Sequence, residues 1–234
     1  MILVILVTVA SYGLAWLIGI PLLMPFFNAA GAWWLMLREL RQGRTGRAIA
    51  VMLVWALTMA VVSTGMAASG WSRTEAGTNM FVRSSYRDEM IQWVRTGVGA
   101  ESTPSVFIPR HLGYAALFAA TSFATGGVFS MPMGAALMNQ MGEYVGSMTA
   151  QSKSPIASAI LGWHPWAVIR IIGFVIIGVV LSGVLLSRLL NFHFDLATER
   201  RWLIIGVALL VIDIVLKWLL APAWAPMLKG LAGW

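Results

Sequence analysis

Glu143 is the carboxylate whose surroundings most favour chemistry inside a helical bundle. Asn139 and Gln140 precede it by four and three residues in a weakly polar, mainly apolar stretch, and such spacings share one helix face. An ionisable side chain at mid-bilayer costs about 2.5–3.5 kcal/mol, so it often marks an ion or solute path. The face predicts either such a path or an interhelical hydrogen-bonding site. The Gly-x-x-x-Gly step of Gly142 and Gly146 favours close approach of another helix.

Asp213 and Lys217 form a second polar pair. They lie four residues apart in an otherwise apolar run, so a helix would place them on one face, where their charges can neutralise each other. The pair predicts a proton or ion site, an intersubunit contact, or a self-compensating pair packed against other helices.

The three histidines, His111, His164 and His193, all lie at borders of apolar runs, and no two of them are four residues apart. His111 and His164 are candidate ligands or proton relays. For His164 the simpler interpretation is an interfacial histidine that is hydrogen-bonded to the backbone. Arg170 enters the following run by one turn, and we expect its side chain to extend back to the membrane interface.

Several chemistries are excluded by the absence of their residues. The sequence has no cysteine, which removes thiolate metal sites and Cys nucleophiles. It also lacks the His-Glu-x-x-His, P-loop and Gly-x-Ser-x-Gly motifs. We therefore expect a protein that is not an enzyme and has no metal site. The sequence identifies no cofactor, and one axial histidine to a pigment or haem in a larger complex stays open.

Composition places the chain in a membrane. Of its 234 residues, 59% are hydrophobic and 11% are charged, whereas soluble domains are about 45–50% apolar and about 25% charged. A water-soluble globular fold is excluded. The net charge of +7 comes from arginines scattered between apolar runs, which indicates membrane topology rather than nucleic-acid binding.

The sequence predicts an all-α, polytopic transmembrane helical bundle, with residues 1–234 forming one integral membrane domain. A helix needs about 20 mainly apolar residues to cross the bilayer core. Six segments are expected to do so, at residues 2–26, 48–68, 112–130, 132–149, 167–186 and 202–220.

Residues 111–150 decide between six spans and five. As one helix they would be roughly 60 Å long, twice the bilayer core. Gly126, Gly127 and Pro132 are the residues at which this stretch would divide, because glycine weakens a helix and proline lacks a backbone donor. The alternative is one long tilted helix and five spans.

Arginine placement favours six spans. Four arginines within residues 28–47 mark that loop as cytoplasmic, because cytoplasmic loops are rich in Lys and Arg. With six spans, the loop that carries Arg188, Arg200 and Arg201 is also cytoplasmic, and both termini and the loop 69–110 lie outside.

The outer loop 69–110 contains one predicted amphipathic helix, at residues 84–98. Its apolar face consists of residues at helical spacing: Tyr86, Met90, Trp93, Val94 and Gly97. It is expected to act as a lid or docking element, or to lie on the membrane surface or on the spans.

Two functions remain from the sequence. The first is a non-catalytic integral subunit within a larger membrane protein assembly, favoured by the small extramembrane mass and by 14 Met, 23 Gly and 12 Trp suited to helix packing. The second is transport of a small solute, an ion or protons that uses Glu143 and Asp213. The expected partners are the lipid bilayer and other membrane subunits or further copies of the chain, and not nucleic acid. The expected location is the bacterial cytoplasmic (inner) membrane.

Overall fold

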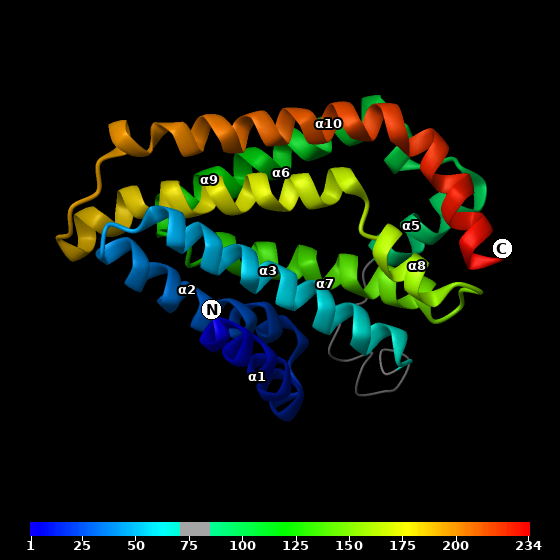
Figure 1. Cartoon of the computed structure of the whole chain (residues 1–234), viewed down its shortest axis with the longest axis horizontal. Coiled ribbons are helices and arrows are strands. Elements are labelled where there is room, and N and C mark those ends of the chain that lie inside the picture. The colour runs from blue at the N-terminus through cyan, green and yellow to red at the C-terminus, as the bar shows by residue number, and fades with distance from the viewer. Residues whose placement is uncertain (71–84) are drawn as a thin grey trace.

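The computed structural model describes residues 1–70 and 85–234, and Figure 1 shows their arrangement. Within these residues the chain forms nine α-helices and no strand, which confirms the predicted all-α class. The α-helices are α1 (Ile2–Ile18), α2 (Met24–Arg41), α3 (Thr45–Ala68), α5 (Ser85–Thr96), α6 (Pro104–Thr125), α7 (Ser130–Thr149), α8 (Pro155–Leu161), α9 (Pro165–Leu190) and α10 (Leu196–Ala232). Two 3-10 turns, η1 (Pro21–Leu23) and η3 (Ala100–Ser102), join some of them.

Three helices in the described part of the chain are long and apolar enough to cross a membrane, namely α3, α9 and α10, and α1 is apolar but shorter. The predicted spans 112–130 and 132–149 correspond to α6 and α7, which are not apolar enough to count among the membrane-crossing helices. For α7 the reason is its position, because most of its residues are buried by other helices. A helix enclosed by protein does not need the apolar surface that lipid requires.

Helix α7 is the centre of the bundle and packs against α2, α3, α5, α6 and α8. Its contact with α3 is close. A Cβ added at Gly146 would lie 2.5 Å from the Cβ of Ala67 and 2.8 Å from the backbone nitrogen of Ala68, and one at Gly142 would collide with Ser63. The close approach predicted from Gly142 and Gly146 is confirmed.

Residues 111–150 divide at the predicted glycines. Gly126 and Gly127 have φ angles of 59° and 89°, in the left-handed region that favours glycine, and the chain turns there from α6 into α7. The indole of Trp33 donates a hydrogen bond of 2.8 Å to the Gly126 carbonyl. The single long helix required by the five-span alternative is therefore wrong.

The predicted first span, residues 2–26, is wrong in its extent. Helix α1 ends at Ile18, Gly19 follows with a φ of 68°, and α2 begins at Met24. Pro25 occupies the first turn of α2, where its missing N–H costs no intrahelical bond. Most of residues 28–47, predicted as a loop, is therefore helix.

This break moves the N-terminus. Met1 and Val4 share a surface depression with Arg38, Glu39 and Arg47, so the chain begins beside the arginines at the end of α2 and the start of α3. The prediction that the N-terminus lies at the opposite end is wrong, because α1 and α2 form a hairpin where the sequence suggested one span.

The two arginine-bearing connections lie at one end of the bundle. The hydroxyl of Thr45, at the start of α3, donates a 2.8 Å hydrogen bond to Glu199 in the first turn of α10. We call this the arginine-rich end, and its arginines are Arg38, Arg41, Arg44, Arg47, Arg188, Arg200 and Arg201. In Figure 1, α5, α8 and the C-terminus gather at the other end, which we call the α5 end.

Helix α5 corresponds to the predicted amphipathic helix at 84–98. Its buried residues Met90, Trp93 and Val94 belong to a core formed with α7 and α10, so its apolar face packs on other helices of the bundle. Residues 71–84 of the predicted outer loop, including the first residue of the predicted helix, lie outside the described residues.

Candidate functional site

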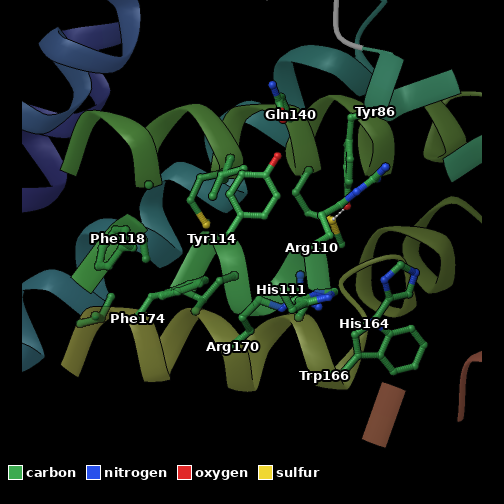
Figure 2. A pocket seen from close by; sticks show the side chains of 18 of the residues that line it. Tyr86, Arg110, His111, Tyr114, Phe118, Gln140, His164, Trp166, Arg170 and Phe174 are labelled. Atoms are coloured by element: carbon green, nitrogen blue, oxygen red, sulfur yellow. Dashed lines mark hydrogen bonds between the residues drawn. The ribbon is translucent and has the colours of Figure 1, made fainter. Parts of the chain in front are cut away.

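A cavity of about 170 Å³ lies inside the bundle between α3, α5, α6, α7 and α9. Figure 2 shows its side chains, with α7 on one side and α9 on the other. Arg110 and Tyr114 line the cavity and are also exposed on the surface, so they mark its mouth.

The two halves of the cavity differ in polarity. Toward the α5 end its wall is polar and includes Tyr86, Glu101, Arg110, His111, His164 and Arg170. The far half is apolar, with Phe118 and Phe174 facing each other at 4.9 Å between ring centroids. A smaller void of about 30 Å³ adjoins this half and shares those two rings in its wall. Figure 2 shows the separation, with His164 and Trp166 opposite Phe118 and Phe174.

Arg170 on α9 is held by Asp213 on α10. Its Nε donates to Oδ2 at 2.9 Å and its Nη2 donates to Oδ1 at 3.0 Å. Asp213 is almost fully buried, whereas Arg170 also reaches the cavity wall. Two predictions are therefore wrong. The side chain of Arg170 is not an unpaired group that extends back to the interface, because it is paired with Asp213. Lys217 is not the principal partner of Asp213.

Lys217 pairs with Glu101 instead. Its Nζ lies 2.8 Å from Oε2 of Glu101 and 4.7 Å from the ring centroid of Phe107. The helix spacing of Asp213 and Lys217 does put both inside the protein, but the residues that face them come from other segments. Glu101 belongs to η3, which packs against α10.

His164 lies at the N-cap of α9 and is buried among aromatic rings. It stacks on Trp166 with ring centroids 4.7 Å apart and planes 12° apart, and meets Trp93 edge-on at 5.4 Å. Its Nε2 lies 3.4 Å from the hydroxyl of Tyr144. Burial, together with the charges of Lys217 and Arg170, lowers the pKa of His164 to about 3. The ring is therefore neutral at physiological pH.

His111 and Tyr86 complete the polar half. Nδ1 of His111 lies 2.6 Å from the carbonyl oxygen of Phe107. A carbonyl oxygen only accepts, so Nδ1 carries the proton and Nε2 is the acceptor nitrogen. The hydroxyl of Tyr86 donates to the sulfur of Met141 at 3.2 Å, and burial raises the pKa of Tyr86 above its ordinary value, so the phenol stays protonated.

The predicted polar face of α7 divides among three surroundings. Gln140 lines the cavity. Glu143 is outside the cavity wall, and its Oε1 lies 3.3 Å from Nη1 of Arg87 on α5. Asn139 donates to Oδ1 of Asn28 at 3.0 Å and accepts from the hydroxyl of Tyr12 at 2.6 Å. Asn139 thus joins α7 to α1 and α2 rather than lining a path.

Among the polar side chains of the cavity, sequence reasoning missed Glu101, Arg110 and Tyr114, and it also missed the apolar pair Phe118 and Phe174. Glu101 and Arg110 lie in the predicted outer loop 69–110, whereas Tyr114 and Phe118 lie in the predicted span 112–130. A signal was present for Arg110, because it directly precedes the candidate residue His111. Within residues 1–70 and 85–234, no group of three His, Asp or Glu side chains could hold a metal ion.

No protein-family model, no curated protein and no solved structure matches this chain.

Proposed function

We propose that the chain is an integral protein of the bacterial cytoplasmic membrane that carries a small solute through the interior of its helical bundle. The observation that carries the proposal is the cavity between α6, α7 and α9, with Arg110, Arg170 and Glu101 in its wall. The proposal includes no bond-making step, so it does not make the chain an enzyme.

The proposed topology has α3, α9 and α10 crossing the membrane, with α6 and α7 as further crossing helices inside the bundle. The arginine-rich end would face the cytoplasm, because positive charge is retained on that side. The polar half of the cavity, which contacts α5 and η3, would then lie toward the outer face, and the apolar half toward the middle of the membrane.

The charges around the cavity support transport over packing alone. Asp213 and Lys217 are almost fully buried on a helix apolar enough to cross a membrane, where ionisable groups are costly. Apolar side chains of similar volume would hold two helices together equally well or better. Buried ion pairs next to a cavity are arranged as expected for a polar solute site within a membrane.

A second function, the non-catalytic subunit of a larger membrane assembly, is favoured by one different observation. The apolar window of α10 is only 17% buried, and it exposes large side chains such as Val207, Val211 and Trp218. In this alternative, helices of another subunit cover part of that face.

Cysteine accessibility separates the two functions. The natural chain has no cysteine, so a single Gln140→Cys variant reports on the cavity alone. Its reaction with a membrane-impermeant methanethiosulfonate would be measured in right-side-out and inside-out vesicles. A carrier exposes its site to each side in turn, so labelling is expected from both sides. Labelling from one side or from neither would contradict transport.

Two controls calibrate this measurement. Val98→Cys, at a position that is 71% exposed between α5 and η3, is expected to react only from the outer side. Leu219→Cys, at an exposed apolar position of α10, is expected to face lipid and to react from neither side.

A further inference from the structure

The wall of the cavity is polar in one half and apolar in the other, which suits an amphipathic ligand. Its polar half holds Arg110, Arg170 and His111, whereas its other half is closed by the rings of Phe118 and Phe174. A ligand that fills both halves has one polar end and one apolar body.

The volume sets the size of that body. The cavity measures about 170 Å³ and the adjoining apolar void about 30 Å³. An apolar protein cavity of about 150 Å³ accepts a benzene ring. The space therefore fits a single ring or a short branched chain with a small polar group, and is too small for a long acyl chain.

Charge sets the chemistry of the polar end. The ionised side chains of the wall are Arg110, Arg170 and Glu101. Glu101 is already matched by Lys217 at 2.8 Å, and Arg170 by Asp213. Of these three wall charges, Arg110 alone is paired with an exposed residue, Glu89, rather than with a buried one, so it is the charge that a ligand can reach without breaking a buried pair.

Arg110 can turn to a ligand at low cost. Its Nη1 lies 3.2 Å from Oε2 of Glu89, and the side chains are 47% and 45% exposed. Such an exposed pair contributes only about 0–1 kcal/mol. Arg170 offers a second donor nearby, because its two hydrogen bonds to Asp213 use Nε and Nη2 and leave Nη1 without a hydrogen-bond partner in the described chain.

We infer that the solute is a small organic monocarboxylate with an apolar body of about one ring, whose carboxylate pairs with Arg110 and whose body lies against the rings of Phe118 and Phe174. The inference rests on the proposed function, because it names the substrate class of the same cavity. Planar guanidinium groups match a carboxylate geometrically, and the aromatic rings offer the body an apolar surface.

Benzoate is the probe that tests this, with benzamide and benzylamine as its neutral and cationic counterparts of the same size. Equilibrium binding to the purified full-length protein in micelles is measured by calorimetry at pH 7. Benzoate is expected to bind at least tenfold more tightly than either counterpart. Equal affinities for all three, tighter binding of benzylamine, or no binding of benzoate would overturn the inference.

Two variants at the mouth of the cavity test the pairing of Arg110 with the ligand carboxylate, and they are expected to change benzoate affinity in opposite directions. Arg110→Gln is expected to weaken benzoate binding about tenfold, the usual effect of losing a hydrogen bond to a charged group, and to leave benzamide unchanged. Glu89→Gln releases Arg110 from its partner and is expected to strengthen benzoate binding severalfold. Weaker or unchanged benzoate binding in Glu89→Gln would contradict the role of Arg110.

A glycine pair tests the apolar half. A Cβ at Gly134 would lie 3.5 Å from Cε2 of Phe118, an ordinary contact, so Gly134→Ala fills cavity space without a collision. Benzoate affinity is expected to fall severalfold. The matched control is Gly113→Ala on α6, where nothing lies within 4 Å of the added Cβ, and affinity should not change. Equal effects of the two variants would show that the body binds elsewhere.

Failure of the ligand class and failure of transport give different results. If Gln140→Cys is labelled from both sides while benzoate does not bind, transport stands and the monocarboxylate assignment falls. If benzoate binds with the expected variant pattern while labelling occurs from one side only, the ligand assignment stands and transport falls.

Discussion

The guanidinium of Arg170 donates two hydrogen bonds to the carboxylate of Asp213, at 2.9 Å and 3.0 Å, and thereby joins α9 to α10 beside the cavity. The two helices pack along their length, and Figure 1 shows them side by side. Their single bidentate pair supplies the charge balance that lets Arg170 stand in a mainly buried wall.

Removing one member of this pair should destabilise the protein strongly. Asp213→Leu leaves the guanidinium of Arg170 without its countercharge, and breaking a buried pair in this way costs about 3–5 kcal/mol. The free energy of unfolding would be measured by SDS titration followed by circular dichroism. The double variant Arg170→Met with Asp213→Leu should recover most of the loss.

The exposed ion pair of Arg110 and Glu89 provides the control, since Glu89→Gln should change stability by less than about 1 kcal/mol. A single variant as stable as the natural protein would contradict the pairing.

The polar network at Asn139 should stabilise the folded protein by more than a single hydrogen bond would. Asn139→Leu would leave the Asn28 amide oxygen buried without its donor and would remove the acceptor of the Tyr12 hydroxyl, and a buried polar group left without its partner costs about 1–3 kcal/mol. Tyr12→Phe removes one hydrogen bond and should cost about 1 kcal/mol. Tyr114→Phe, at a tyrosine that is 42% exposed, is the matched control and should be neutral. If the Asn139 and Tyr12 variants lose equal stability, the network does not act as a unit.

The close contact of α3 and α7 predicts opposite effects for two glycines. In Gly146→Ala the new Cβ meets backbone atoms of α3, so one helix must move, and overpacking of this kind costs about 1–3 kcal/mol. Gly65 lies on α3 with nothing within 4 Å of an added Cβ. Gly65→Ala should therefore stabilise the helix by up to about 1 kcal/mol. Thermal unfolding of both variants tests this, and a neutral Gly146→Ala would show that the helices are not in contact there.

Local signals in the sequence predicted the parts of the fold that depend on local structure. Long apolar runs identified α3, α9 and α10, and the Gly126–Gly127 step identified the break before α7. The hairpin of α1 and α2 was missed because α2 contains a buried glutamate, Glu39, among Arg38, Arg44 and Arg47. Charged residues at this density are typical of a loop, and the sequence alone does not show that they form ion pairs.

The site could be predicted only in part, because its charges are matched over long sequence distances. Helix spacing suggested that Asp213 faces Lys217, but their partners Arg170 and Glu101 come from α9 and η3. A pattern of three and four residues cannot choose between a neighbour on the same helix and one that tertiary packing supplies. His111, His164 and Gln140 were singled out by residue type, and it is the packing of α6, α7 and α9 that brings them to one cavity.

The buried imidazole of His164 predicts a specific loss of stability in acid. Its folded-state pKa is lowered to about 3 from an ordinary value of 6.5, because burial and the nearby charges of Lys217 and Arg170 oppose protonation. Between these values the unfolded chain binds a proton that the folded chain does not, so stability falls as pH falls. The contribution should be about 1.4 kcal/mol per pH unit once the pH is below roughly 6. His164→Phe keeps a ring to stack on Trp166 but cannot titrate. The difference in unfolding free energy between the natural protein and this variant, measured from pH 7.5 to pH 5, isolates His164 from other titrating groups. That difference should shift in favour of the variant as pH falls, and parallel pH profiles would show that the imidazole is not held neutral by burial.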